Sequence, residues 1–250
     1  SSLTIPEGAC LFANKPLRYT SITINGILTR SIKGYGDSTN NSISIEVDEL
    51  VIESTGSIDA SGRGHRGGYT SNTSGEGEGG GHSDQNTEYG KGYPASYGGL
   101  GGNQNIAQCY GSIVEPNKMG SGGGSGCDRT IGGTWFRVIR GGNGGGYVYI
   151  KCNGNLVNNG KILANGLPGE RYNTSSNIYA GAGSGGSIYL YVRGELSGAS
   201  AGLISANGGG FSSKPNSQCG AGGGRIAIYY GSKSNFLNTL QAGGGNTDVT

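Results

Sequence analysis

The residues able to perform acid–base chemistry or bind a metal are few in this chain of 250 residues. Its two histidines, His65 and His82, lie near Glu76, Glu78 and Asp84 in a glycine-rich stretch. Imidazole and carboxylate groups form metal sites and acid–base pairs only when their spacing brings them to one point. The spacings typical of such sites are missing, so we interpret these residues as polar loop positions and expect no metal and no cofactor.

A second set of charged residues is the only material for a polysaccharide-cleaving site. Such enzymes use clustered carboxylates, in some cases with Ca²⁺ and a basic residue. The candidates are Asp59, Asp84, Asp128, Arg137 and Arg140. Because they are scattered along the chain, the sequence favours a protein that is not an enzyme. A polysaccharide lyase or hydrolase stays as an alternative.

Charge and hydropathy argue against several partners. Lysine and arginine total 18 against 16 acidic residues, a net charge of +2, which offers no basic surface for nucleic acid or anionic lipid. The apolar stretches are much shorter than the roughly 20 residues that span a bilayer. Gly90-Lys91-Gly92 lacks the hydroxyl residue and the helix of a phosphate-binding loop. We therefore expect no nucleic acid, no membrane insertion and no nucleotide.

The five cysteines lack the Cys-x-x-Cys spacing of zinc sites and indicate an oxidising, extracellular location. Cys109 and Cys127 are the predicted disulfide, since a bond between them would close a flexible glycine-rich loop. An odd number of cysteines leaves a thiol over. We expect it to be Cys152, buried on an inward face, with a Cys152–Cys219 disulfide as the alternative.

Two further sets of residues point to an exposed, extracellular surface. Asn-x-Ser/Thr sequons in polar segments are the predicted glycosylation sites, at Asn40, Asn72 and Asn173. Aromatic side chains in the glycine-rich centre are candidates for contact with a glycan or a partner protein. These are Tyr69, Tyr89, Tyr93 and Tyr97. Core filling is the alternative role of such tyrosines.

A repeated unit organises the elements that would position these residues. An Ile/Leu-x-Ala triplet followed by glycine, or by Asn-Gly or Ser-Gly, occurs at 58–60, 162–164, 204–206 and 240–242. Ahead of each triplet lies a stretch of alternating apolar residues, at 43–47, 148–152, 188–192 and 225–229. Alternation with β-branched and aromatic residues predicts strands, and the density of glycine disfavours helices.

The stacking of such units predicts the fold class. One strand pair cannot cover its own apolar face, whereas stacked copies bury a continuous apolar ladder. We therefore expect an all-β, right-handed parallel β-helix (solenoid) with glycine-rich, partly polyproline-II-like loops. The chain is predicted to be one domain, with N-terminal rungs at 1–61, a glycine-rich insertion at 62–146 and three C-terminal repeats at 147–250.

Glycine makes up 55 residues and is densest in the insertion 62–146. A flexible linker would contain little besides glycine and serine, and collagen would need glycine at every third position. The insertion contains several aromatic residues and breaks the collagen register. We expect ordered, extended glycine segments of polyproline-II character, because only glycine lets backbones approach each other closely.

Taken together, several motifs resemble the glycine-rich repeat regions of large extracellular proteins of protists, plants and bacteria. They are Gly-Ser-Ile-Asp-Ala-Ser-Gly at 56–62, the loop 110–124, Gly-Ser-Gly-Gly-Ser-Ile-Tyr-Leu at 183–190, Ile-Ser-Ala-Asn-Gly-Gly-Gly at 204–210 and Gly-Gly-Gly-Arg-Ile-Ala-Ile-Tyr at 222–229. The resemblance implies a secreted or surface-anchored β-helical module without a catalytic motif. A looser similarity is to the polyglycine tip adhesins of phage tail fibres.

These observations predict a non-catalytic structural subunit of an extracellular filament, coat or matrix. We expect it to be glycosylated and to assemble with itself or with other matrix proteins. An adhesin that binds a glycan or a surface receptor is the first alternative, and a polysaccharide-active enzyme is the second.

Overall fold

The computed structural model describes residues 1–32, 42–84, 89–102, 108–129, 135–171, 179–210 and 220–245. Within these ranges the regular elements are all strands. They are β1 Ser2–Ile5, β2 Cys10–Phe12, β3 Leu17–Ile24, β4 Ile27–Thr29, β5 Ser42–Ile52, β6 Ser57–Asp59, β7 Tyr89–Gly90, β8 Gly126–Arg129, β9 Trp135–Ile139, β10 Tyr147–Cys152, β11 Leu156–Asn158, β12 Lys161–Leu163, β13 Ser187–Gly198, β14 Leu203–Ser205, β15 Arg225–Phe236 and β16 Thr239–Gln241.

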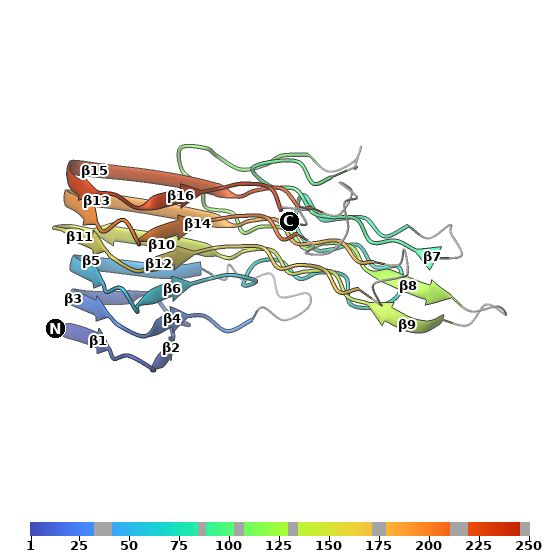
Figure 1. Ribbon diagram of the computed structural model, residues 1–250, viewed down its shortest axis with the longest axis horizontal. Helices are drawn as coiled ribbons and strands as arrows, with labels where there is room; N and C mark the ends of the chain where they lie inside the picture. Colours follow the sequence, from blue (N-terminus) through green and yellow to red (C-terminus); the bar gives the residue numbers. More distant parts are fainter. Residues whose placement is uncertain are drawn as a thin grey trace.

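Two parallel sheets form one end of the elongated molecule (Figure 1). The larger sheet runs β1-β3-β5-β10-β13-β11, and β15 pairs with β13. The smaller sheet runs β16-β14-β12-β6-β4-β2. The chain visits the two sheets in turn, so that each pass adds one strand to each sheet, except that β10 and β11 of one pass both join the larger sheet. We call the strands added in one pass a tier. The first tier is β1 with β2, and the last is β15 with β16.

The core consists of columns of apolar side chains at matching positions of successive tiers. In the smaller sheet, Leu28, Ile58, Ile162 and Ile204 lie in register and are fully buried. In the larger sheet, Ile43, Val148 and Ile188 form a column of the same kind. The strands and triplets predicted from the repeats therefore pair in the expected register, because alternation places every second side chain inside.

The predicted right-handed parallel β-helix was wrong. Both β10 and β11 pair with β5 on one side and with β13 on the other, so these four strands close a small parallel barrel. The strand is interrupted between Cys152 and Leu156, at Gly154. The described residues also contain an antiparallel sheet, and their glycine-rich segments are far more extensive than corner loops. Repeats indicate which strands pair in parallel. They do not determine whether those strands also close into a barrel.

The insertion 62–146 does not separate the repeats in space. Strand β6, before the insertion, pairs directly with β12, which follows it, through Ile58 and Ile162. The chain leaves the sheets after β6 and returns at β10, and in Figure 1 the insertion extends away from the sheets. At the far end, β7, β8 and β9 form the antiparallel sheet.

Extended glycine segments form a second layer beside the sheets. Each segment bonds to several neighbours through its backbone: Gly123 donates to Gly142, Gly142 to Gly181, and Gly181 to Gly124, over 2.9, 2.9 and 2.8 Å. The segment 120–126 is bonded in this way to five others, at 60–68, 75–82, 90–99, 140–146 and 180–186. The layer therefore satisfies its backbone groups internally, although it contains almost no regular strand.

Close approach of backbones explains why this layer consists of glycine. A Cβ atom at Gly123 would lie 2.1 Å from the carbonyl oxygen of Gly181, and one at Gly181 would lie 1.7 Å from that of Tyr93. The close packing expected for the glycine-rich centre is thus present. It also includes segments within the C-terminal repeats, such as 180–186 and 220–224, so the glycine layer is not confined to the insertion.

Candidate functional site

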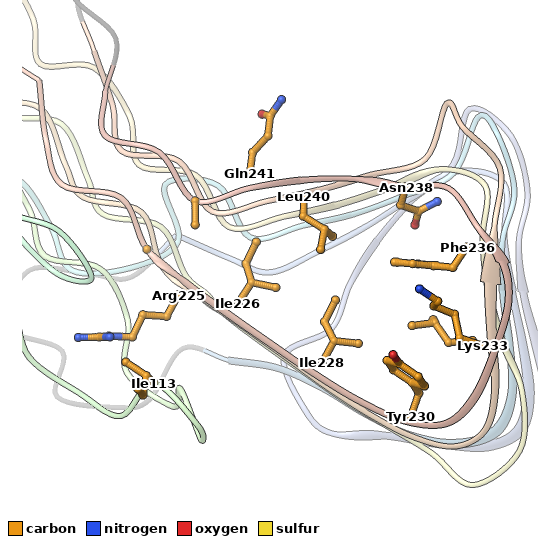
Figure 2. A pocket seen from close by; sticks show the side chains of 13 residues that line it. Ile113, Arg225, Ile226, Ile228, Tyr230, Lys233, Phe236, Asn238, Leu240 and Gln241 are labelled. Atoms are coloured by element: carbon orange, nitrogen blue, oxygen red, sulfur yellow. The ribbon is translucent and has the colours of Figure 1, made fainter.

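An open cavity lies at the exposed end of the last tier, between β15 and β16. It has a volume of about 730 Å³. Ile226 and Ile228 from β15 and Leu240 from β16 contribute apolar walls, and Phe236 closes one side (Figure 2). A cavity of this size with an apolar lining is within the usual range for binding sites. We call it the end groove.

Within the described residues, the apolar columns reach the end groove without a covering tier. Leu240 continues the column of Ile58, Ile162 and Ile204, yet its side chain is 52% exposed whereas Ile204 is fully buried. Ile226 and Ile228 likewise continue columns whose previous members, Ile188 and Leu190, are fully buried. The sequence pattern that fills the core inside the stack thus leaves an apolar surface at its last tier.

Lys233 is the exception among the residues that end a column. Its position in β15 pairs with Leu196, and the same column contains Leu156, Leu50 and Ile22 in the preceding tiers. Figure 2 shows its side chain pointing into the end groove between Phe236 and Tyr230. One position that is apolar in every tier from β3 to β13 therefore has a cation in the last.

The end groove continues onto an exposed apolar surface. Tyr191, Tyr229 and Tyr230 are each exposed by more than a third, and Ile113 and Val114 of the neighbouring loop are exposed further. The hydroxyl group of Tyr229 donates to the carbonyl of Val114 at 2.9 Å, which places the loop beside the sheet. Contiguous apolar surface with a polar rim is typical of an interaction site.

A tyrosine ladder runs across the outer face of the larger sheet toward this surface. The rings of Tyr149 and Tyr189 are 5.6 Å apart between centroids, and those of Tyr189 and Tyr229 are 5.8 Å apart. The angles between their planes are 49° and 77°. These tilted contacts stabilise neighbouring tiers through aromatic packing.

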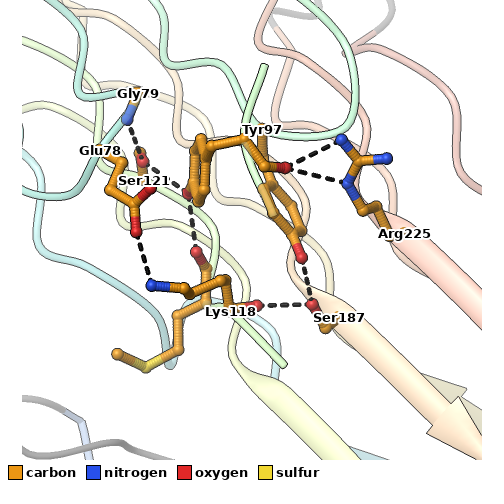
Figure 3. Close-up of polar contacts among 9 residues, drawn as sticks. Glu78, Gly79, Tyr97, Lys118, Ser121, Ser187 and Arg225 are labelled. Atoms are coloured by element: carbon orange, nitrogen blue, oxygen red, sulfur yellow. Dashed lines mark hydrogen bonds and ion pairs between the residues drawn. The ribbon is translucent and has the colours of Figure 1, made fainter. Parts of the chain in front are cut away.

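A partly buried polar network connects the glycine layer to the starts of β13 and β15 (Figure 3). The hydroxyl groups of Tyr97 and Ser187 are 2.6 Å apart, and Ser187 donates to the carbonyl of Lys118. Arg225 donates twice to the carbonyl of Tyr110, over 3.1 and 2.8 Å. Lys118 forms an ion pair with Glu78 at 2.7 Å.

The chemistry of this network is structural. Burial raises the pKa of Tyr97 and that of Tyr110, so both phenols are neutral hydrogen-bonding groups. Tyr110 lies within 2.7 Å of both the Ser121 hydroxyl and the Met119 carbonyl. The hydroxyl groups of Ser187 and Ser121 thus have the phenols of Tyr97 and Tyr110 as hydrogen-bond partners.

The histidines and acids of the insertion have several different contacts. His82 stacks on Tyr93, with ring centroids 6.5 Å apart, and Glu78 pairs with Lys118. Glu76 accepts a bond from the backbone of Arg66. Over the described ranges, no three His, Cys, Asp or Glu residues are grouped so as to hold a metal ion.

The residues considered for polysaccharide cleavage are dispersed as well. Asp59 accepts from the backbone of Ser61 at 2.8 Å, in the turn after β6. The backbones of Asp128 and Arg137 face each other between β8 and β9, at the far end of the molecule. Arg140 lines a smaller cavity with Arg66 and Tyr69. These positions do not form one constellation.

The candidate contact tyrosines have different environments. Tyr97 has the alternative, core-filling role: it is fully buried and belongs to the network in Figure 3, so it is not available to a partner. Tyr69 is half-buried under the guanidinium of Arg66, 4.5 Å from the ring centroid, and Tyr93 is half-buried beside His82. The side chain of Tyr89 lies outside the described part of the structure.

The predicted Cys109–Cys127 disulfide is not formed in the structure. Cys109 is an exposed free thiol, whereas Cys127 is fully buried and its Sγ donates to Asn72 at 3.3 Å. The glycine layer holds this region through backbone bonds instead. Cys152 is buried on the inward face, as predicted, and its Sγ donates to the carbonyls of Asp48 and Asn155. Cys219 lies outside the described residues.

Among the sequons, only Asn72 falls within the described residues. It is half-exposed, has a φ of 59°, and its side-chain oxygen accepts the bond from Cys127. Asn40 and Asn173 lie outside the described residues. Glycosylation at the three positions stays a prediction.

The end groove was missed from the sequence, although a signal was present. In the last repeat, Lys233 occupies the place that Leu156 and Leu196 hold in the two before it.

No helix in the described residues has the length and apolar character of a membrane span. Comparison with known proteins gave no match to a family model, to a curated protein or to a solved structure.

Proposed function

We propose that this protein is a non-catalytic structural subunit of an extracellular filament, coat or matrix. A neighbouring protein chain, a second copy or another matrix protein, would join it end-on at the last tier. The observation that carries this proposal is the end groove, where Ile226, Ile228 and Leu240 end buried columns at an exposed surface. Burying these side chains under one more tier would stabilise the junction through the hydrophobic effect.

The edge strands of the last tier support the same proposal. In the described chain, β15 pairs only with β13 and β16 only with β14, so each has one side without a neighbouring strand. Unpaired strand edges accept a further strand through backbone hydrogen bonds. The first tier offers a similar edge, where Phe12 of β2 is 53% exposed.

The location outside the cell rests on the sequons and on the resemblance to surface proteins. The absence of catalysis rests on the scattered acids and on the structural roles of the buried hydroxyl groups described above. An architectural role also agrees with the use of glycine, which here allows backbone packing.

The proposal is tested by measuring what the last tier accepts. The probe is a fluorescent peptide copying residues 187–198, the strand that β15 already pairs with, and its binding is followed by fluorescence anisotropy. Light scattering over a range of concentrations measures association of intact copies. We expect at least one of these two kinds of association in the unaltered protein.

Leu240→Lys places a second cation at the end groove and is expected to weaken whichever association is found by at least about tenfold. Leu100→Lys is the matched control, since Leu100 is 62% exposed but does not line the end groove. A protein that stays monomeric and also fails to bind the peptide would overturn the proposal. Equal loss in both variants would overturn it too.

A further inference from the structure

Lys233 distinguishes the last tier from a plain apolar edge. Its column contains Ile22, Leu50, Leu156 and Leu196 in the inner tiers. Its ammonium group points into the end groove beside Phe236 (Figure 2). Among the described residues, ion pairs join Arg18 to Glu46 and Lys118 to Glu78, and neither involves Lys233. The nearby Glu195 accepts from the hydroxyl of Ser234.

The register of β15 shows what an added strand would place next to this cation. Lys233 pairs with Leu196 of β13, and neighbouring strands are about 4.8 Å apart. A further parallel strand on the open side of β15 would therefore put one side chain of the same column against the ammonium group. If that side chain were apolar, the junction would bury an unpaired charge, which costs free energy.

We infer that the end groove binds an extended segment of a partner protein as a parallel strand, with an acidic side chain facing Lys233. The alternating apolar side chains of that segment would cover Ile226 and Ile228. This inference rests on the proposed end-on function and adds the chemistry of the partner. A carboxylate at the Lys233 position neutralises the cation and distinguishes the right partner from other apolar strands.

The same register argues against the first tier of a second copy as the preferred occupant. In that tier the column position is held by Leu3, which pairs with Ile22. Stacking one copy on another in register would place Leu3 on Lys233. The irregular pairing of β15 with β13 around this position, together with the φ of 45° at Asn235, further distorts the edge. Inward charges and bulges are common protections against unwanted edge pairing.

A charge exchange tests this inference. Three fluorescent peptides copy residues 187–198 and carry Leu, Glu or Lys at the position of Leu196; they are otherwise identical. Each is titrated against the unaltered protein and against Lys233→Glu and Lys233→Met. We expect the unaltered protein to bind the Glu peptide at least about tenfold more tightly than the Lys peptide, and also more tightly than the Leu peptide.

In Lys233→Glu the order of the Glu and Lys peptides should reverse, and in Lys233→Met the Leu peptide should bind best. The circular dichroism spectrum and melting temperature of each variant show whether it is folded. If Lys233→Glu does not fold, Lys233→Met supplies the comparison. An unaltered protein that prefers the Leu peptide would overturn the acidic partner while leaving end-on joining intact. Failure of all three peptides would also overturn this inference, and light scattering would then decide the proposed function separately.

Discussion

Lys233 and Cys152 show that an inward-facing position of the larger sheet can be buried in one tier and open to solvent in another. Both belong to inward columns of the larger sheet, Cys152 between Val47 and Val192 and Lys233 after Leu196. The inner tier buries the Cys152 thiol completely, whereas the last tier leaves Lys233 at an open groove. Whether an inward side chain must be apolar thus depends on the presence of a tier above it.

Burial should make Cys152 less reactive than the exposed thiols of Cys10 and Cys109. Burial raises its thiol pKa from 9.0 to about 11. Since the thiolate is the nucleophile, alkylation by iodoacetamide at pH 8 should be at least about tenfold slower at Cys152 than at the exposed Cys10 and Cys109. Mass spectrometry of the alkylated peptides over time measures this. Equal rates at Cys10 and Cys152 in folded protein would contradict the burial of Cys152.

The same pKa shift has a consequence for stability. The folded state keeps the proton on Cys152 at a pH where the unfolded chain has lost it, so this contribution is complete below pH 9 and is lost as the pH rises from about 9 to 11. Cys152→Ala should reduce that part of the pH dependence. Urea unfolding of the two proteins at pH 8 and pH 10.5 makes the comparison.

At the scale of elements, each glycine segment contacts defined neighbouring segments, just as each strand pairs with defined strands. Gly123 donates to Gly142 in one neighbouring segment and packs against the carbonyl of Gly181 in another. Its role is close approach, because a Cβ atom would clash with backbone that cannot rotate away. In this protein, a glycine-rich segment that has neither helical periodicity nor strand alternation is therefore still an ordered element with close backbone packing.

Gly123→Ala should destabilise the protein by more than about 2 kcal/mol, since the added Cβ would lie 2.1 Å from the Gly181 oxygen. Gly99→Ala is the control, because the nearest atom to its Cβ would be the Gly223 nitrogen at 3.5 Å. That substitution should change the free energy of unfolding by less than about 1 kcal/mol. Urea unfolding measures both. Equal effects would show that the layer does not depend on backbone contact.

The sequence predicted the features that depend on a local residue pattern. It did not predict how the strands close into a barrel. The triplets at 58–60, 162–164 and 204–206 pair as the repeat predicts, since each carries its own alternation. The barrel formed by β5, β10, β13 and β11 depends on an interruption at Gly154, which no repeat indicates. Tyr97 was a candidate for contact with a partner, with core filling as the alternative, and the structure buries it fully and bonds it to Ser187.

At the scale of the whole molecule, the candidate site lies at the last tier of the described residues, which has a neighbouring tier on one side only. The middle tiers have neighbours on both sides, whereas the first and last tiers each have one. Burial follows this order: Ile58 and Ile162 are fully buried, whereas Leu240 is half-exposed. Local stability should therefore fall from the middle of the stack toward both ends.

Native-state hydrogen exchange should reveal this gradient. Amides of β10 and β12 are expected to exchange at least about a hundredfold more slowly than those of β15 and β16, because opening an inner tier exposes apolar side chains on both of its faces. Mass spectrometry of peptic fragments resolves the strands. Addition of the peptide copying 187–198 with Glu at position 196 should slow exchange in β15 and β16 and leave β10 unchanged. Uniform exchange along the stack would contradict the gradient, and slowing confined to the far antiparallel sheet would place the partner away from the end groove.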